Sequence, residues 1–198
     1  EKIMNDWTGN KKTTFATLGA SSHSETEREK NDFYATSPVA VHELLKHHEF
    51  QKNILEPSCG NGIMSEALKE HGHIVKSSDL IDRGYGDVMD FFSIESASGM
   101  DIVTNPPYRY SKQFVEHALK IVDDGSEVAM FLRIQFLESK SRRDLFDNTP
   151  PKLVFIPSGR IACAKNADFE NIGSSAQMYA WFIWEKGFTD STQIKWFN

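Results

Sequence analysis

Hydrophobic and polar positions alternate with two periods in the first half of the chain. From Ser37-Pro38 onward, Val41, Leu44 and Leu45 recur at helical spacing, and Pro38 suits the first position of a helix. The apolar run in "KNILEPSCGNG" predicts a strand that enters a glycine turn, and "GIMSEALKEHG" predicts a helix that ends at Gly72. A second strand is expected in "HIVKSSDL" and a further short element in "GDVMDFF".

The second half continues the same alternation. We expect a strand in "DIVTNPPY", a helix in "SKQFVEHALKIV", a strand in "SEVAMFLRI" and a helix in "SKSRRDLFDN". Two late strands, "PKLVFIPS" and "AQMYAWFIW", have no good helix between them, so a hairpin that adds an antiparallel edge is expected. This order predicts an α/β fold with a mostly parallel sheet and helices on both faces. Residues 159–176 are expected to form a long loop, and long loops in compact domains are often functional or flexible.

Composition indicates one soluble domain. The chain has 198 residues, which suits a single core over residues 31–198 preceded by a polar arm over residues 1–30. No apolar run approaches the ~20 residues that span a membrane, and no signal peptide is evident. Cys59 and Cys163 match no disulfide or zinc spacing, which favours a cytoplasmic protein. The histidines show no ligand spacing, so no metal is expected.

The net charge of -6 disfavours a protein that coats nucleic acid by bulk electrostatics, although it leaves room for a local basic patch.

A cofactor site is predicted where the first strand becomes a helix. Gly60 and Gly62 allow close approach of the backbone to a ligand, and Asp79 ends the next strand 19 residues after Gly60. An acid in that place accepts hydrogen bonds from a ribose diol. The turn is not GxGxxG, and no Lys-Ser/Thr follows it, so dinucleotide and P-loop interpretations weaken. The pattern therefore favours another nucleoside-containing cofactor, against the alternatives of a tight connection and a solvated acid.

The strand at 101–104 ends in Asn105-Pro106-Pro107-Tyr108, because prolines cannot donate to a sheet ladder. A plain strand-ending turn is the structural alternative. With "DFYATSP", "ILEPSCGNG", "SSDL", "MDFF" and "MYAWFIW", the chain resembles S-adenosylmethionine-dependent amino-methyltransferases with an (Asn/Asp)-Pro-Pro-(Tyr/Phe) motif. The order is similar to that of N6-adenine DNA methyltransferases of the gamma arrangement, especially small phage or prophage members. The resemblance covers roughly residues 31–185.

The resemblance implies a Rossmann-like class I methyltransferase fold with seven strands, the last antiparallel. It implies S-adenosylmethionine as cofactor, S-adenosylhomocysteine as product, no metal, and a bacterial or phage-infected host cell. Asp79 would bind the ribose, Leu80 would lie beside the adenine ring, and Asp90 and Phe91 would contact that ring. Asp82 and Asp87 are alternatives to Asp79 and Asp90 in these roles. Phe91 and Phe92 could instead belong to the hydrophobic core. The implied cofactor contacts are Tyr34, Thr36, Pro38, Glu56, Pro57, Gly60, Gly62, Asp79, Leu80, Asp90, Phe91 and Asn105.

The tetrapeptide suits transfer to a conjugated amine, which is a poor nucleophile because its lone pair is delocalised. The Asn105 side-chain oxygen and the Pro106 carbonyl oxygen can accept the two amine hydrogens. The prolines stiffen the turn that holds these acceptors. Tyr108 offers a face on which a flipped base stacks, worth ~1–3 kcal/mol. The predicted catalytic residues are therefore Asn105, Pro106, Pro107 and Tyr108.

The motif serves adenine in DNA, adenine or guanine in RNA, and protein glutamine amides. Basic residues interleaved with aromatics favour nucleic acid, and a solvated helix face is the alternative for Arg142 and Arg143. The predicted substrate contacts are Tyr108, Arg109, Lys112, Arg142, Arg143 and Arg160.

DNA is the predicted partner, and the absence of an extra N-terminal helical domain favours nucleic acid over protein. No recognition domain is expected after residue 186. Specificity would then come from the arm, residues 159–176, a second copy in a homodimer, or another protein. An RNA or protein-glutamine methyltransferase and a non-catalytic cofactor-binding subunit are the alternatives.

Overall fold

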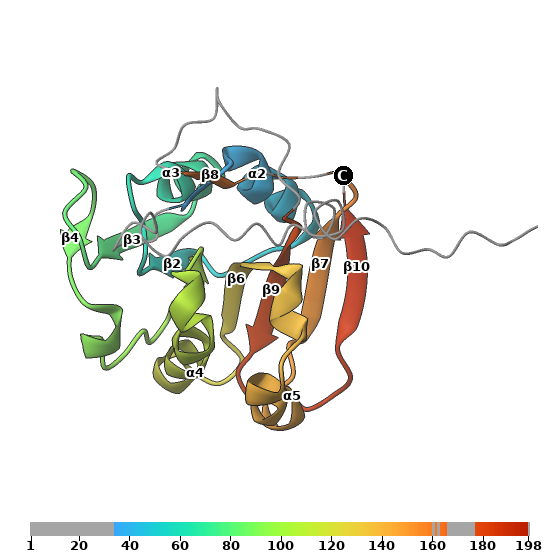
Figure 1. Ribbon diagram of the computed structural model, residues 1–198. Coiled ribbons are helices and arrows are strands. Elements are labelled where there is room, and N and C mark those ends of the chain that lie inside the picture. Colours follow the sequence, from blue (N-terminus) through green and yellow to red (C-terminus); the bar gives the residue numbers. More distant parts are fainter. Residues whose placement is uncertain (1–33, 160, 162, 166–176, 198) are drawn as a thin grey trace, which may run out of the picture.

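The computed structural model describes residues 34–159, 161, 163–165 and 177–197 (Figure 1). The polar arm 1–30, Arg160 and most of the loop 159–176 lie outside the described residues. The main feature is an eight-stranded sheet in the order β10-β7-β9-β6-β5-β2-β3-β4. Its strands are β2 (Asn53–Glu56), β3 (Ile74–Asp79), β4 (Asp87–Val88), β5 (Asp101–Thr104), β6 (Glu127–Arg133), β7 (Leu153–Pro157), β9 (Tyr179–Glu185) and β10 (Gln193–Phe197).

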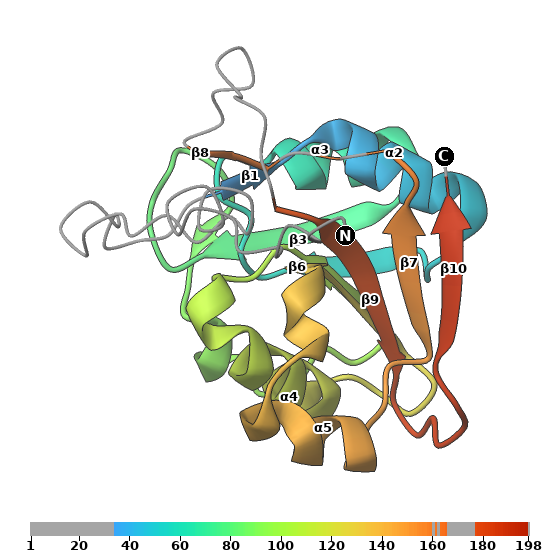
Figure 2. The same cartoon turned by 45° about the vertical axis from the view of Figure 1, so that its right-hand side comes forward.

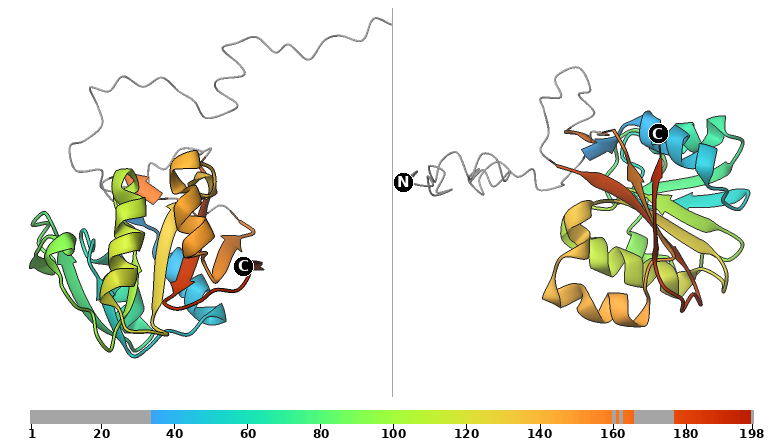
Figure 3. Two further views of the ribbon diagram at one scale, coloured as in Figure 1. Left: turned by 90° about the horizontal axis from the view of Figure 1, so that it is seen from below. Right: turned by 90° about the vertical axis from the view of Figure 1, so that its right-hand side faces the viewer.

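Helices cover both faces of this sheet, as the alternating pattern predicts (Figure 3). On one face lie α2 (Pro38–His47) and α3 (Ile63–Glu70); on the other lie α4 (Ser111–Ile121) and α5 (Arg143–Asn148). Neighbouring residues of β6 point to opposite faces, so Met130 joins the α4 core and Phe131 joins the α2 and α3 core. Short 3-10 turns complete the connections: η2 (Phe91–Ser93), η3 (Tyr108–Tyr110), η4 (Ile134–Leu137) and η5 (Lys140–Arg142).

Strand β9 is antiparallel to both of its neighbours, β6 and β7, whereas every other neighbouring pair in the sheet is parallel. The predicted antiparallel pairing of the two late strands, β7 and β9, is confirmed, but the predicted edge position is wrong. Trp181 and Ile183 enter one core, and Phe182 and Trp184 enter the other, all at most 1% exposed. A strand that is apolar on both faces has to be covered on both, so β9 lies inside the sheet.

The expected number of seven strands is one too few. Strand β10 pairs in parallel with β7 and forms the edge of the sheet, and Figure 2 shows the two arrowheads at the same end. Ile194 and Trp196 alternate with the polar residues Gln193 and Lys195, all four exposed, and Phe197 is buried beside α2. This short alternation is the sequence signal that could have revealed β10.

A separate two-stranded ribbon joins distant parts of the chain. Strand β1 (Tyr34–Thr36) pairs antiparallel with β8 (Cys163–Lys165), with Thr36 opposite Cys163 (Figure 2). The segment that leads into α2 therefore lies against part of the long connection between β7 and β9. None of the described helices is both long enough and apolar enough to span a membrane.

Candidate active site

The candidate site lies where the strand order reverses. Strands β2 and β5 are neighbours, but the chain runs from β2 outward to β3 on one side and from β5 outward to β6 on the other. Open α/β sheets bind ligands beyond the carboxyl ends of the strands at such a switch point. The glycine turn follows β2 and the Asn-Pro-Pro-Tyr segment follows β5, so the fold brings these two predicted motifs to one place.

The glycine turn has a backbone that only glycine adopts readily. Gly60 has φ 56° and Gly62 has φ 85°, and Gly62 is the N-cap of α3. A Cβ on Gly62 would lie 2.4 Å from Cδ2 of Tyr85, whose ring covers this position. The Gly62 amide donates to the Cys59 carbonyl at 2.8 Å, which closes the turn. The turn is therefore closed by its own hydrogen bond, and the Tyr85 ring occupies the space over Gly62.

Asp79 ties the end of β3 to the glycine turn. Its Oδ2 accepts from the Gly60 amide at 2.9 Å, and its Oδ1 accepts from the Ile81 amide at 3.0 Å. An ionised carboxylate has about four lone-pair sites, so these two bonds leave capacity for a diol. Leu80, which follows Asp79, is 66% exposed. The predicted ribose acid and the predicted neighbour of the adenine ring thus lie together, and their roles remain predictions.

Glu56 is a buried acid beneath the turn. It is 2% exposed and accepts a hydrogen bond from the Ser65 hydroxyl, which also lies 2.6 Å from the Ser77 hydroxyl. Burial outweighs the Ser65 hydrogen bond, and together with the charge of Asp79 it raises the pKa of Glu56 to about 8. The Glu56 carboxyl is therefore largely protonated at neutral pH. Pro57 follows it directly and begins the glycine turn.

The segment before α2 contributes a buried hydroxyl. Thr36 is 4% exposed, and its Oγ1 has no hydrogen-bond partner among the described residues. A buried hydroxyl without a partner costs roughly 1–3 kcal/mol, which fits a site that a ligand completes. Tyr34 lies in the same strand, and Pro38 occupies the first turn of α2 as predicted.

Phe91 and Phe92 have different environments. Asp90 caps η2 by accepting from the Phe92 amide at 2.9 Å. Phe91 is 2% exposed and packs on Phe114 and His117, both with ring centroids at 4.8 Å. Phe92 is the exposed ring of the pair. Phe91 therefore belongs to the hydrophobic core, as the alternative interpretation expected. A contact between Phe91 and a cofactor ring remains a prediction.

The Asn105–Tyr108 segment ends β5 as predicted and is held by local hydrogen bonds. The Tyr110 amide donates to the Pro107 carbonyl at 2.8 Å, and the Ser111 hydroxyl donates to the Tyr108 carbonyl at 3.0 Å. Asn105 is half-buried and Pro106 is buried. Because the turn is fixed on both sides, its amide and carbonyl groups keep one arrangement at the end of β5.

Arg133, the last residue of β6, was not singled out by sequence reasoning. Its Cζ lies 4.7 Å from the centroid of the Tyr108 ring, and the Tyr179 ring lies 5.9 Å from the same centroid. The available signal was a single cation directly after six apolar or buried positions at the carboxyl end of a strand. The ring expected to stack on a substrate therefore has a cation on it.

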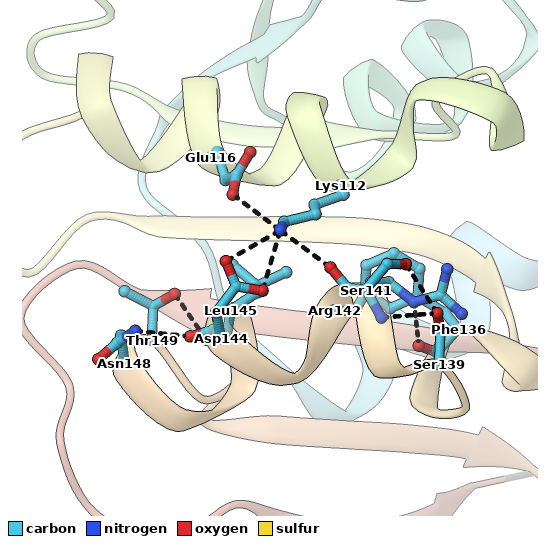
Figure 4. A network of polar contacts seen from close by, with 10 residues as sticks. All are labelled: Lys112, Glu116, Phe136, Ser139, Ser141, Arg142, Asp144, Leu145, Asn148 and Thr149. Carbon is cyan, nitrogen blue, oxygen red and sulfur yellow. Dashed lines mark hydrogen bonds and ion pairs between the residues drawn. The ribbon is translucent and has the colours of Figure 1, made fainter.

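Lys112 has contacts inside the protein that account for its charge (Figure 4). Its Nζ lies 3.0 Å from both oxygens of Asp144, 3.6 Å from Glu116, and donates to the Ser141 carbonyl at 3.0 Å. The residue joins α4 to α5. Substrate binding by Lys112 is consequently not proposed further.

Arg142 also has a structural position (Figure 4). Its Nε donates to the Phe136 carbonyl at 2.7 Å, and its Nη2 donates to the carbonyls of Gln135 and Glu138. Burial lowers the pKa of Arg142. The guanidinium holds η4 in place, so we do not propose that it binds substrate.

Arg143 and Arg109 are the other two predicted substrate contacts among the described residues, and their surroundings differ. Arg143 is exposed and pairs with Asp147 at 2.7 Å, which matches the solvated helix face. Arg109 lies beside the Asn105–Tyr108 turn, with its Cζ 5.6 Å from the Tyr110 ring centroid. Arg160 lies outside the described residues. Among the residues that the structure describes, no group of His, Cys, Asp or Glu could hold a metal ion.

Comparison with known proteins finds similarity in solved structures alone. No protein-family model and no curated protein matches the chain. A protein from Listeria monocytogenes that is described as a putative class I S-adenosylmethionine-dependent methyltransferase has a TM-score of 0.52 at 13% identity over 93% of this chain and 70% of that one. A protein from Pyrococcus horikoshii that is described as a putative RNA methyltransferase has a TM-score of 0.55 at 14% identity over 88% of this chain and 98% of that one.

The M protein of the type I restriction enzyme EcoKI has a TM-score of 0.51 at 14% identity, over 82% of this chain and 45% of that one. These TM-scores establish a shared fold, and the identities of 13–14% carry nothing beyond the fold. The chain therefore has the Rossmann-like fold of class I methyltransferases, which confirms the predicted fold class.

Proposed function

We propose that this chain transfers a methyl group from S-adenosylmethionine to the exocyclic amino group of adenine in DNA. The observation that carries the proposal is the position of Asn105-Pro106-Pro107-Tyr108. The segment ends β5 directly beside β2, whose glycine turn and buried Glu56 lie at the same edge of the sheet. A strand-ending turn of purely structural purpose has no need of this neighbour.

The described residues fit the proposed cofactor. Gly60 places no side chain between its backbone and a ligand, Asp79 keeps lone pairs for a ribose, and Thr36 has a buried hydroxyl that a ligand could satisfy. Leu80 offers an exposed apolar surface for the adenine ring. When bound, S-adenosylmethionine supplies an electrophilic methyl group on a sulfonium.

The chain's part in the chemistry is to hold the amine. The Asn105 side-chain oxygen and the Pro106 carbonyl oxygen would accept its two hydrogens and favour a tetrahedral nitrogen with a localised lone pair. Neither acceptor needs to be a strong base, because the proton can leave during or after transfer. Since positioning carries most of such a reaction, the rigid Pro-Pro turn is the main contribution of the protein.

Nucleic acid is favoured over protein as substrate by the surface around Tyr108. A base needs a flat ring and nearby cations, and Tyr108, Arg109 and Arg133 provide both at this edge. DNA is favoured by the resemblance of the motif order to adenine DNA methyltransferases. The shared fold does not separate the two nucleic acids, since it occurs in the EcoKI M protein and in the Pyrococcus protein alike.

Tritiated S-adenosylmethionine tests the proposal in parallel reactions with unmethylated genomic DNA, total RNA and a protein extract. We expect label in DNA, and nuclease digestion should recover it as N6-methyladenine. Asn105→Ala should abolish transfer while calorimetry shows retained cofactor binding; Lys120→Met, an exposed charge change at the distal end of α4, is the control. Label in RNA or protein alone would overturn the DNA assignment, and activity retained by Asn105→Ala would overturn the role of that residue.

A further inference from the structure

Two side chains from neighbouring strands contact the Tyr108 ring. The guanidinium of Arg133 lies over its ring at 4.7 Å, and the Tyr179 ring lies 5.9 Å away at an interplanar angle of 38°. Arg133 ends β6 and Tyr179 begins β9, and the two residues are direct partners in the antiparallel ladder. The contacts on Tyr108 therefore come from one paired position in the sheet.

This paired position is rigid. Tyr179 is 6% exposed and stacks on Phe131 at 5.4 Å with an interplanar angle of 18°. Phe131 in turn packs on Trp181 at 5.0 Å, and the Trp181 indole donates to the Ala40 carbonyl at 3.0 Å. A row of buried rings thus runs from the helix layer to the edge of the site, with Arg133 fixed beside its last member.

We propose that Arg133 is a positioning residue for the substrate base: its guanidinium holds the Tyr108 ring in the orientation on which the base stacks. The inference rests on the proposed function and extends it to a residue outside the Asn-Pro-Pro-Tyr motif. A planar guanidinium stacks on an aromatic face and stays charged at all working pH values, whereas a lysine ammonium acts as a point charge.

The expected effect falls on substrate binding. Because the contact orients the ring equally before and during transfer, its loss should raise KM for DNA and leave kcat unchanged. A cation–π contact at a half-buried site corresponds to roughly two- to thirtyfold in affinity. The dissociation constant of the cofactor should not change, since Arg133 lies at the end of β6 and the glycine turn follows β2.

Steady-state methylation of unmethylated genomic DNA with tritiated S-adenosylmethionine tests this proposal. Arg133→Met should raise KM within that range, and Arg133→Lys should recover part of the loss. Lys120→Met removes one exposed positive charge at the distal end of α4 and should behave as wild type. An equal rise of KM in Lys120→Met would mean bulk electrostatics, and a fall in kcat or in cofactor affinity for Arg133→Met would mean structural damage; either result overturns the proposal.

A second comparison isolates the ring. In a Tyr108→Phe background, which keeps the ring, Arg133→Met should reduce kcat/KM by the same factor as in the wild type. In a Tyr108→Leu background the further reduction should vanish, because no face remains to be held. An equal loss in both backgrounds overturns the proposal. Failure of the proposed function is distinguishable, since the wild type would then put no label into DNA.

Discussion

The buried carboxyl of Glu56 makes the stability of this protein depend on pH in an unusual direction. Its pKa lies at about 8 in the folded chain, against an ordinary value of 4.5. Between these two pH values the unfolded chain has lost the Glu56 proton and the folded chain keeps it. The unfolded state therefore binds fewer protons, and the free energy of unfolding falls as pH rises through this window.

The size of the effect follows from the two pKa values. A difference of about 3.5 in pKa corresponds to about 5 kcal/mol at ~1.4 kcal/mol per unit. This is an upper figure, and it is a large part of the ~5–15 kcal/mol that stabilises a typical domain. Glu56→Gln removes the ionisation and keeps a side-chain oxygen that can accept from Ser65. The variant should match the wild type near pH 4.5 and become progressively more stable than it up to pH 8, with a constant difference above that.

Urea unfolding followed by circular dichroism, without cofactor, measures both proteins at intervals from about pH 4.5 to about pH 9. Glu95→Gln is the matched control, because Glu95 is an exposed glutamate on the connection before β5. The control should follow the wild type at every pH. A difference between Glu56→Gln and wild type that does not grow with pH would refute the assignment of a protonated Glu56 in the fold.

Three further predictions concern the glycine turn, the contact of Lys112 between α4 and α5, and the loss of stability at acidic pH. Gly62→Ala should destabilise more than Gly125→Ala: both have φ above +80°, which costs roughly 1–2 kcal/mol, but only at Gly62 does the Cβ meet the Tyr85 ring. Equal losses in urea unfolding would contradict this. Lys112→Met should lower the thermal midpoint and leave KM for DNA unchanged, and a raised KM in the methylation assay would restore its substrate role. Burial opposes ionisation of Glu127, but hydrogen bonds and charge from His48 and Lys152 lower its pKa below the ordinary value of 4.5. The ionised carboxylate therefore stabilises the folded chain above pH 4.5, and this stabilisation is lost as the pH falls further. In Glu127→Gln the free energy of unfolding should consequently fall less steeply with decreasing pH than in the wild type.

The local elements and the glycine turn could be predicted from the sequence because their causes are local. Pro38 at a helix start, Gly62 at a strand-to-helix turn and the two prolines after β5 each act through their own backbone geometry. Helical and strand periods then imply two helix layers over a sheet. The place of Asp79 beside Gly60 follows as well, since the carboxyl ends of parallel neighbours meet at one edge.

Contacts between elements distant in the chain depended on packing. The inward position of β9 arises because both its faces are apolar and need cover, and β10 becomes the edge because β7 still has a free side. Lys112 meets Asp144 only because α4 and α5 lie on the same face, and Arg133 meets Tyr108 only because β5 and β6 are neighbours. Periodicity reports which residues are buried, whereas strand order determines which charges and rings meet, and that order is set by the free energy of the whole core.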